Sequence, residues 1–340
     1  MTKTRRLGKI YHCSMIPLVY QKLQEYIAKA DHILLLTDER IDGDTMGSTM
    51  GLFHVLNDLG KHVEVFSPKP LPNTFKYLPR VDVIRRDIEV FLEPTIDLMI
   101  ICDCSDGEYI KKLLPTMPHK VPLISFDHHA TNPMYGAINI VEPKAASTAD
   151  VVWRFLKSTA WSISPEAAQC ILTGICTDTV LFSTPNTTTD ALDASAELVK
   201  LGAQLPEIVR HNLMNKSVSA LKLWGLAMER LYHDTTFDAT ATVIMKADIE
   251  KLQGTEEDIS GISGFLHAML DTQHEVVVVY RETDDGSVKG SMRSRGRDVA
   301  KLAAEKYGGG GHKLAAGFKI PNSKLIEKDG RWVVEKIPVV

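Results

Sequence analysis

The sequence predicts an α/β protein: a doubly wound, mainly parallel sheet in an N-terminal domain, and a smaller α/β C-terminal domain with a mixed sheet. Up to about residue 189, short runs that are apolar on both faces alternate with helical periodicity, which is typical of a parallel sheet covered by helices. A strand-and-hairpin pattern follows a helix-rich segment. We therefore expect domains at 15–189 and 237–340, joined by a helical linker at 190–236.

In the first half, amphipathic segments predict helices and short apolar runs predict strands. Ser164 and Pro165 form a typical N-cap and first-turn pair, which opens a helix through about Ile175. The other expected helices cover 17–30, 45–60 and 147–159, and the expected strands cover 33–36, 62–68, 97–106 and 121–129.

In the second half, Asp285-Gly286 between two apolar runs predicts a β-hairpin over 275–294. A helix expected at 297–307 is stopped by four consecutive glycines. The remaining expected elements are helices within 190–232, a short helix at 264–270, and strands at 240–247 and 332–340.

Composition excludes several classes of protein. The chain has 340 residues, is 44% hydrophobic and 24% charged, and can therefore build real cores. With a net charge of -4, any nucleic-acid partner is expected to be a small fragment held in a local basic site and not a long duplex held by a basic face. No apolar run approaches the roughly 18 residues of a membrane span, and the N-terminus lacks the apolar segment of a secretory signal.

The cysteines indicate a reducing compartment. They are odd in number, form no CxxC pair, and lie scattered at positions 13, 102, 104, 170 and 176. Buried reduced thiols are the simplest interpretation, so we expect a cytoplasmic protein with no membrane partner. The sequence leaves the oligomeric state open, with a homodimer as one option.

Acids and histidines recur where the expected strands end or helices begin. In an open parallel sheet, ligands bind beyond the carboxyl ends of the strands, so these side chains would share one crevice. Crowded carboxylates would have raised pKa values, and divalent cations remove that conflict. Oxygen ligands mixed with imidazole suit manganese or magnesium better than structural zinc. The clusters are Asp38/Asp42/Asp44, Asp103/Asp106, Asp127/His128/His129, and Asp178.

Taken singly, most of these clusters also have a structural explanation. TDERIDGD (37–44) could be a solvated loop rich in turn residues, and DCSD (103–106) could be the N-cap region of a helix. Asp178 lies in TDT, a common turn or cap. Adjacent histidines after a buried strand are harder to explain in that way, and the four clusters together favour a metal site.

The segment GSMRSRGRDVAKLAAEKYGGGGHKLAAGF (290–318) carries a second signal. Consecutive glycines let the backbone approach a ligand and expose N–H groups to an anion. A helix C-cap needs only one glycine, so four suggest more than the structural alternative of a cap and a flexible turn. The candidate substrate-binding residues are Arg293, Arg295, Gly309, Gly310, Gly311 and His312.

These motifs together resemble those of the DHH family of phosphoesterases. The resemblance rests on IDGDTMGS (41–48), DCSD (103–106), DHH (127–129) and GICTDT (174–179), and on GGGGHKLAAGF (308–318), which resembles the signature of the DHH-associated C-terminal domain. It extends from about residue 30 to 320. Within the family, the chain resembles the bacterial nano-RNase and pAp-phosphatase branch and its relatives that cleave cyclic di-AMP or pApA.

The resemblance implies two divalent metal ions, usually Mn²⁺, with Mg²⁺ or Co²⁺ as alternatives. It also implies that His129 lies near the scissile phosphate as hydrogen-bond donor or general acid, and that Arg293 and His312 hold substrate phosphate, with Arg295 a weaker candidate. The implied ligands are Asp42 and Asp103 for the first metal, and Asp44, Asp103, His128 and Asp178 for the second, with Asp103 shared.

The chain departs from the family pattern at three positions. Asp38 stands where relatives usually carry a histidine ligand, so the first metal site either keeps a carboxylate ligand there or binds metal more weakly. Ile41 replaces a common proline, and Ser183 stands where relatives often carry arginine. Gly43 is expected to make a tight turn between Asp42 and Asp44.

The sequence therefore predicts a metal-dependent phosphoesterase that hydrolyses short oligonucleotides and dinucleotides such as pApA to mononucleotides, and that could also remove the 3′-phosphate of pAp. One alternative is a cyclic di-AMP phosphodiesterase. An alternative of another class is a nucleotide-binding protein with weak catalysis, because Asp38 replaces the usual histidine ligand.

Overall fold

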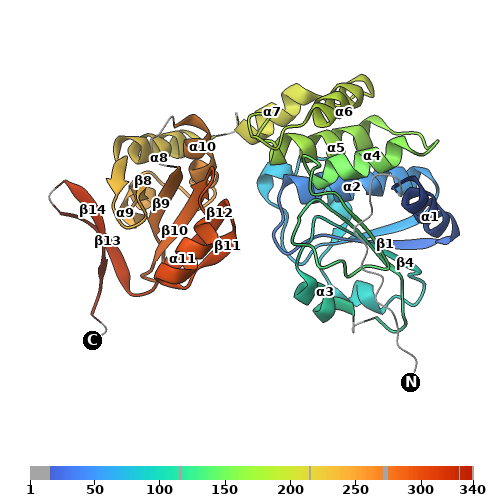
Figure 1. Cartoon of the computed structure of the whole chain (residues 1–340), viewed down its shortest axis with the longest axis horizontal. Helices are drawn as coiled ribbons and strands as arrows, with labels where there is room; N and C mark the ends of the chain where they lie inside the picture. The colour runs from blue at the N-terminus through green and yellow to red at the C-terminus, as the bar shows by residue number, and fades with distance from the viewer. Residues whose placement is uncertain (1–15, 115–116, 214–215, 271–274, 329, 339–340) are drawn as a thin grey trace. The chain divides into compact units, whose positions relative to one another are not determined.

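The structure is a computed structural model that describes residues 16–338 except 115–116, 214–215, 271–274 and 329. The chain divides into two compact units, Met1–Met214 and Asn215–Val340, which are described separately (Figure 1). The helices expected to form a linker lie on both sides of this division. Helices α6 (Thr189–Lys200) and α7 (Leu205–Leu213) belong to the first unit, and α8 (Val218–Glu229) belongs to the second.

The first unit contains a six-stranded sheet, and every pair of neighbouring strands in it is parallel. The strand order β3-β2-β1-β4-β5-β6 is that of a doubly wound fold, with the topological switch point between β1 and β4. The prediction of a doubly wound parallel sheet is therefore confirmed. The strands are β1 (His32–Leu36), β2 (His62–Phe66), β3 (Ile84–Arg85), β4 (Leu98–Cys102), β5 (Leu123–Asp127) and β6 (Ile138–Val141).

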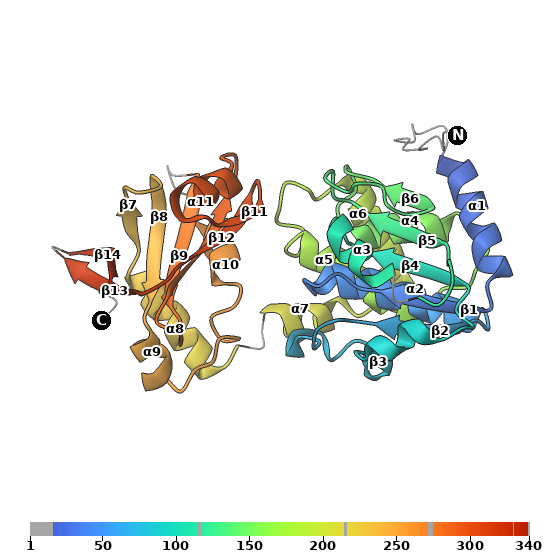
Figure 2. The ribbon, with the colours of Figure 1, turned by 90° about the horizontal axis from the view of Figure 1, so that it is seen from below.

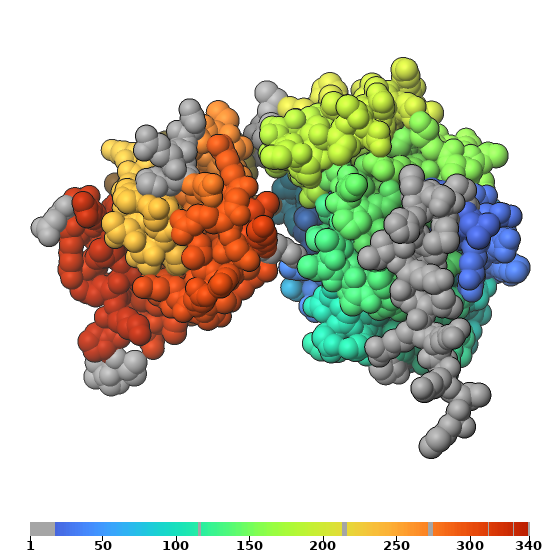
Figure 3. Space-filling view, in the orientation of Figure 1, coloured from blue at the N-terminus to red at the C-terminus, as the bar shows by residue number. Residues whose placement is uncertain are grey.

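Helices cover both faces of this sheet, which explains why its central strands are continuously apolar. In β1, Ile33 and Leu35 pack into a core shared with α1, α2, α4 and α5, whereas Leu34 and Leu36 pack on the opposite face with α3 and η3. Figure 1 shows α2 and α5 on one side of β1 and α3 on the other. The helices are α1 (Ile16–Lys29), α2 (Gly43–Asp58), α3 (Gly107–Leu113), α4 (Thr148–Lys157) and α5 (Pro165–Asp178), with short 3₁₀ turns η1 (Asn73–Phe75), η2 (Val81–Val83) and η3 (Ile88–Leu92). Helices α6 and α7 add an outer layer, which Figure 3 shows in yellow-green on the surface of the first unit.

Glycines let α2 and α5 approach each other closely. A β-carbon at Gly47 would lie 2.5 Å from the backbone nitrogen of Gly174 and 2.6 Å from the carbonyl oxygen of Cys170. One turn earlier, a β-carbon at Gly43 would lie 2.4 Å from the Thr177 side chain. Gly43 is the first residue of α2 and has no positive φ, so the expectation that it makes a tight turn is wrong. Its missing side chain instead makes room for α5.

Substitution of Gly47 tests this contact. Gly47→Ala should lower the free energy of unfolding by about 1 to 3 kcal/mol, because backbone lies on the far side of the contact and cannot move as a side chain would. Differential scanning calorimetry measures the change. Gly225→Ala in α8 is the control, because a β-carbon there meets no atom within 4 Å and a helical glycine gains up to about 1 kcal/mol on becoming alanine. Equal melting temperatures for the two variants would contradict the close approach.

The second unit contains a mixed six-stranded sheet in the order β11-β12-β10-β9-β8-β7, in which only β8 and β9 among the described pairs are parallel (Figure 2). The hairpin expected around Asp285-Gly286 is confirmed by β9 and β10, and Gly286 has the positive φ of 71° that such a turn uses. The strands are β7 (Tyr232–Asp234), β8 (Ala239–Ile244), β9 (Val276–Glu282), β10 (Val288–Ser294), β11 (Gly310–His312) and β12 (Ala315–Ile320).

Helices lie on both faces of this second sheet as well. Val277 and Val279 of β9 pack against α8 and α10, while Val276 and Val278 face the core that contains α11. The helices are α8, α9 (Lys246–Lys251), α10 (Ile262–Met269) and α11 (Val299–Tyr307). A separate hairpin follows, β13 (Ser323–Lys328) and β14 (Arg331–Lys336). The strand expected at 332–340 thus ends earlier, at Lys336, and residues 339–340 lie outside the described residues. No helix in the described part of the chain is both long and apolar enough to cross a membrane.

Candidate metal centre

The predicted site residues of the first unit lie beyond the carboxyl ends of β1, β4 and β5, around the topological switch point. They come from separate segments. Asp42 and Asp44 lie at the start of α2, Asp103 directly follows β4, His128 directly follows β5, and Asp178 is the last residue of α5.

Asp42 and Asp44 are fixed by helix N-termini. Asp42 is the N-cap of α2, and its Oδ1 accepts hydrogen bonds from the backbone N–H groups of Asp44 and Thr45, both at 3.0 Å. Asp44 is fully buried. Its two oxygens accept the backbone N–H groups of Thr148 (2.6 Å) and Ala149 (2.8 Å), in the first turn of α4. The unpaired N–H groups at a helix N-terminus are natural donors to acidic side chains, so both carboxyl groups are held in a fixed position.

Asp103 is held by two threonine hydroxyls. Thr45 donates to its Oδ2 at 2.7 Å and Thr148 donates to its Oδ1 at 3.0 Å. The backbone of Asp103 has a φ of 60°, in the left-handed region that costs free energy for most residues. Backbone strain of this kind is concentrated at functional sites, where the surrounding structure imposes it.

His128 connects the acids. Its Nε2 lies 3.9 Å from Oδ2 of Asp44, 3.9 Å from Oδ1 of Asp103 and 3.7 Å from Oδ2 of Asp178. Burial and the neighbouring His129 lower the pKa of His128, which favours the neutral imidazole that ligates metals. The described residues form two groups that could hold a metal ion: Asp44, His128 and Asp178, and Asp103, His128 and His129.

His129 is oriented by Asp127. Oδ1 of Asp127 accepts the backbone N–H groups of His128 and His129 and lies 2.7 Å from Nδ1 of His129. Oδ2 of Asp127 accepts a hydrogen bond from Nδ2 of Asn132 at 2.6 Å, so both oxygens of the carboxylate have hydrogen-bond donors. Burial alone would lower the pKa of His129, but the hydrogen bond with Asp127 and the charge of Asp103 raise it to about 9.

The acids of this centre repel one another. Burial first, and then the charges of Asp178 and Asp42, raise the pKa of Asp44 well above its usual range. Burial and the charges of Asp44 and Asp42 do the same for Asp103, and burial and Asp42 raise the pKa of Asp178 to about 7. A divalent cation would stabilise all of these carboxylates in their charged form. The donor set of carboxylate oxygens and imidazole nitrogens therefore fits a metal ion.

Comparison with known proteins places this centre in a family. The model of the DHH family, N-terminal domain, matches residues 32–175, and the model of the DHHA1 domain matches residues 240–329. The bifunctional oligoribonuclease and PAP phosphatase NrnA of Thermus thermophilus is 31% identical over 294 residues, which cover 86% of this chain and 85% of that protein. The chain belongs to the DHH family.

Other members of the DHH family resemble the chain over most of its length. The crystal structure of an exopolyphosphatase-related protein from Bacteroides fragilis has a TM-score of 0.81 and 26% identity, with 92% of each chain covered. The cyclic-di-AMP phosphodiesterase GdpP of Geobacillus thermodenitrificans is 25% identical over 337 residues, which cover 92% of this chain but 48% of that protein. Asp178 lies three residues beyond the matched N-terminal domain, yet the structure brings it to His128.

Asp38, the position at which the resemblance leads us to expect histidine, belongs to neither of the two potential metal groups. It is buried, its Oδ1 accepts the backbone N–H of Glu39, and its Oδ2 lies 3.5 Å from the guanidinium of Arg40. Burial raises its pKa despite Arg40. Asp42 also belongs to neither group. Ligation by these two residues therefore stays a prediction.

In the second unit, the predicted substrate residues Arg293 and His312 lie on β10 and β11, the strands on either side of β12. Ala315 of β12 is opposite Arg293 of β10 on one side and opposite His312 of β11 on the other. The His312 side chain lies outside the described part of the structure. Arg295 donates hydrogen bonds to the carbonyl oxygens of His267 and Leu270, and so satisfies backbone acceptors at the end of α10.

Three of the four glycines have reasons within the fold. Gly308 ends α11 with a φ of 65°. A β-carbon at Gly309 would lie 2.4 Å from the carbonyl oxygen of Gly317, and one at Gly311, whose φ is 144°, would lie 2.5 Å from that of Ala315. A β-carbon at Gly310 would meet no atom within 4 Å; the same holds at Gly308, which is the helix cap. Packing therefore accounts for Gly309 and Gly311, and Gly310 is the stronger ligand candidate.

Sequence reasoning missed the residues that support the acids. Thr148 binds Asp44 through its backbone and Asp103 through its hydroxyl, and Thr45 and Asn132 hold Asp103 and Asp127. One sequence signal could have pointed to Thr148: a helix begins at Ser147-Thr148, and the N–H groups in the first turn of a helix attract anions. Asp106, by contrast, proves to be the N-cap of α3, the structural alternative considered for DCSD.

Three consecutive residues after Asp178 have left-handed backbone. Val180, Leu181 and Phe182 have φ values of 46°, 53° and 65°. The turn is held by the Leu181 N–H, which donates to the Cys176 carbonyl at 2.7 Å, and by the Thr179 hydroxyl, which accepts the Phe182 N–H at 3.1 Å. Left-handed backbone is least favourable for a β-branched residue, so Val180 is the most strained of the three.

Replacement of Val180 should release this strain. Val180→Gly is expected to raise the free energy of unfolding by up to about 1 kcal/mol, because the cost of a left-handed L-residue exceeds the unfolded-state cost of glycine. The same change at Val199, exposed on helix α6, should lower it by about 0.5 kcal/mol. Thermal unfolding of both variants measures the difference, and destabilisation at both positions would argue against a strained turn.

Proposed function

We propose that this DHH protein is a metal-dependent phosphoesterase that hydrolyses short oligoribonucleotides and dinucleotides such as pApA to mononucleotides, and that it removes the 3′-phosphate of pAp. The proposal depends above all on the buried acids around His128, whose negative charges a divalent cation would stabilise together. The similarity to NrnA over most of both chains supports the substrate class.

The first unit would hold two divalent ions. We assign Asp42 and Asp103 to the first ion, with Asp38 as a further candidate, and Asp44, Asp103, His128 and Asp178 to the second. Mn²⁺ fits a site of carboxylates and imidazole, and Mg²⁺ and Co²⁺ are alternatives. When bound, such a pair supplies an activated water and neutralises charge on the phosphoryl oxygens.

The protein's own residues would position the substrate. His129 is held through Nδ1 by Asp127, so we propose that its Nε2 donates to the phosphate or to the leaving oxygen. Arg293 and His312, with the backbone of Gly310, would bind a substrate phosphate in the DHHA1 unit. Gly309 and Gly311 would act through the shape of β11, and Arg295 is the weaker candidate because it holds the end of α10.

Two alternatives have a specific basis. Similarity to GdpP favours cyclic di-AMP as a second candidate substrate, although this chain covers only 48% of that protein. The position of Asp38 outside both potential metal groups keeps open a nucleotide-binding protein with weak catalysis. An activity panel with pAp, pApA, short RNA and cyclic di-AMP against Mn²⁺, Mg²⁺ and Co²⁺ separates these functions. A cytoplasmic location is part of the proposal, supported by free buried thiols at Cys102, Cys104, Cys170 and Cys176.

Asp103→Asn tests the shared ligand. The amide keeps the size of the side chain but removes its charge, so hydrolysis of pApA with Mn²⁺ should fall by about a thousandfold or more. Asp106→Asn is the matched control from the same motif, because Asp106 caps α3 and asparagine is an equally good N-cap. Steady-state kinetics and Mn²⁺ titration calorimetry measure both variants. Wild-type activity in Asp103→Asn would refute the assignment.

Asp38→His tests the departure from the family pattern. If Asp38 contributes to the first metal site, an imidazole there should tighten Mn²⁺ binding, because nitrogen ligands bind this class of metal well. Isothermal titration with Mn²⁺ measures the change, with Glu39→Gln, an exposed neighbour, as control. An unchanged titration would place residue 38 outside the metal's ligands.

A further inference from the structure

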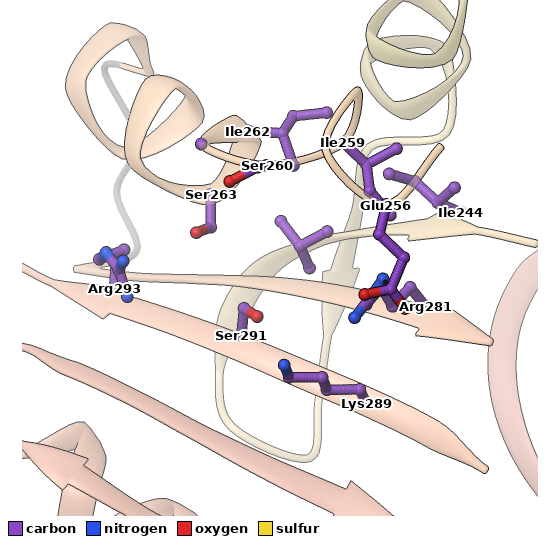
Figure 4. A pocket seen from close by; sticks show the side chains of 12 residues that line it. Ile244, Glu256, Ile259, Ser260, Ile262, Ser263, Arg281, Lys289, Ser291 and Arg293 are labelled. Carbon is purple, nitrogen blue, oxygen red and sulfur yellow. Dashed lines mark ion pairs between the residues drawn. The ribbon is translucent and has the colours of Figure 1, made fainter. Parts of the chain in front are cut away.

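The second unit contains a cavity of about 340 Å³ between the sheet and the segment that leads into α10 (Figure 4). Its size is that of small-molecule sites. One wall is formed by β9 and β10, and the other by residues 256–263. Figure 4 shows Ser260 and Ser263 facing Ser291 across the cavity, and Arg293 at the opposite end from Arg281 and Lys289. The lining residues are Ile244, Glu256, Ile259, Ser260, Gly261, Ile262, Ser263, Val279, Arg281, Lys289, Ser291 and Arg293.

The strand register fixes the order of these side chains. Lys289, Ser291 and Arg293 alternate along β10 and therefore point to one face of the sheet. Arg281 of β9 is directly opposite Lys289. Residues 289 and 293 are four apart in a strand, which separates them by about 13 Å. Basic groups thus stand at two ends of the cavity, with a serine between them.

The two ends carry an excess of positive charge. No carboxylate among the described residues forms an ion pair with Arg293 or Lys289, and Arg293 donates only to its neighbour's carbonyl, Met292, at 3.0 Å. Burial lowers the pKa of the Arg293 guanidinium, as expected for a cation withdrawn from water without a partner. The single acid of the lining, Glu256, lies 2.9 Å from Arg281, and its side chain is 70% exposed.

The middle of the cavity differs from its ends. Ile259, Ile262 and Val279 supply apolar wall, while Ser260, Ser263 and Ser291 supply hydroxyls. An apolar wall suits the faces of a nucleobase, and hydroxyls suit its polar edge or the sugar. A purely inorganic anion would leave this middle part unfilled, so the occupant carries an organic group between two anionic groups.

We propose that Arg281 and Lys289 form a second anion position, so that this cavity holds a nucleoside phosphorylated on both its 5′ and 3′ oxygens. Such a ligand is an internal nucleotide of an oligonucleotide, and pAp is its smallest analogue when no metal is bound in the first unit. The proposal rests on the proposed function for its first anion position at Arg293. Glu256 pairs with Arg281 while the position is empty, and an incoming phosphate replaces that carboxylate.

Ligand binding to the full-length protein in excess EDTA tests the proposal, because chelation prevents turnover and leaves the acidic centre repulsive to phosphates. Isothermal titration compares pAp with 5′-AMP, which lacks the 3′-phosphate, and with adenosine. We expect wild type to bind pAp at least about tenfold more tightly than 5′-AMP, since one charge-assisted contact is worth that much. Equal affinities for the two nucleotides would overturn the proposal.

Variants separate the two positions. Lys289→Ala should reduce affinity for pAp to about that for 5′-AMP and leave 5′-AMP binding unchanged, whereas Arg293→Ala should weaken both. Glu256→Gln should tighten pAp binding, because it removes the competing carboxylate. Lys301→Ala is the control: this exposed lysine of α11 lies outside the cavity and should change neither affinity.

The outcomes also separate this proposal from the proposed function. A Lys289→Ala protein that keeps the wild-type preference for pAp, or loses both ligands equally while retaining the wild-type melting temperature, would refute the second anion position. Hydrolysis of pApA by wild type with Mn²⁺ is measured separately. Selective pAp binding without hydrolysis would support the second anion position and refute the phosphoesterase activity. Hydrolysis without selective binding would support the phosphoesterase activity and refute the second anion position.

Discussion

The burial of Asp44 and Asp103 beside further acids is the constraint on which the first unit depends. Each carboxylate is withdrawn from water, so its charge has to be stabilised by protein donors or by a cation. Thr148 serves both acids at once, through its backbone N–H and its hydroxyl. The start of α4 must therefore lie directly against the start of α2.

Helix packing provides this position. Gly174 of α5 faces both neighbours, because a β-carbon there would lie 2.4 Å from the β-carbon of Ala149 and 3.0 Å from Oδ1 of Asp44. The glycines that bring α2, α4 and α5 together thus also create the space in which Asp44 accepts its hydrogen bonds. Any side chain at Gly174 would disturb the fold and the acidic centre together, which is why packing and chemistry cannot be separated in this unit.

The sequence was sufficient for the parts of the molecule that depend on local pattern. Apolar runs such as ILLL (33–36) predict a strand buried on both faces, and Ser164-Pro165 predicts the start of α5 within a residue. The clustering of acids also followed, because strand ends in a parallel sheet share one edge. The helix start at Thr148 could be read from the sequence, but its pairing with Asp44 and the role of Gly43 could not, since each depends on a contact between segments more than a hundred residues apart.

The glycine-rich segment shows the limit of composition as a signal. The four glycines are equivalent in the sequence, but they have different roles in the structure. Gly308 caps a helix, while Gly309 and Gly311 lack a β-carbon that would collide with the backbone of β12. Only the register of β11 against β12 distinguishes Gly310. Register is set by pairing with a distant strand, so it cannot be read from the segment itself.

Each unit, taken by itself, carries charge that its own residues leave unbalanced. In the first unit the excess is negative and a small inorganic cation can neutralise it. In the second unit no acid among the described residues forms an ion pair with the half-buried Arg293 or the exposed Lys289, so both can bind an anion. A phosphate ester is the ligand class that meets both demands, because it supplies an anion to the guanidinium and coordinates divalent metal. A metal-storage protein would need only the first of these features, and a simple anion-binding module only the second.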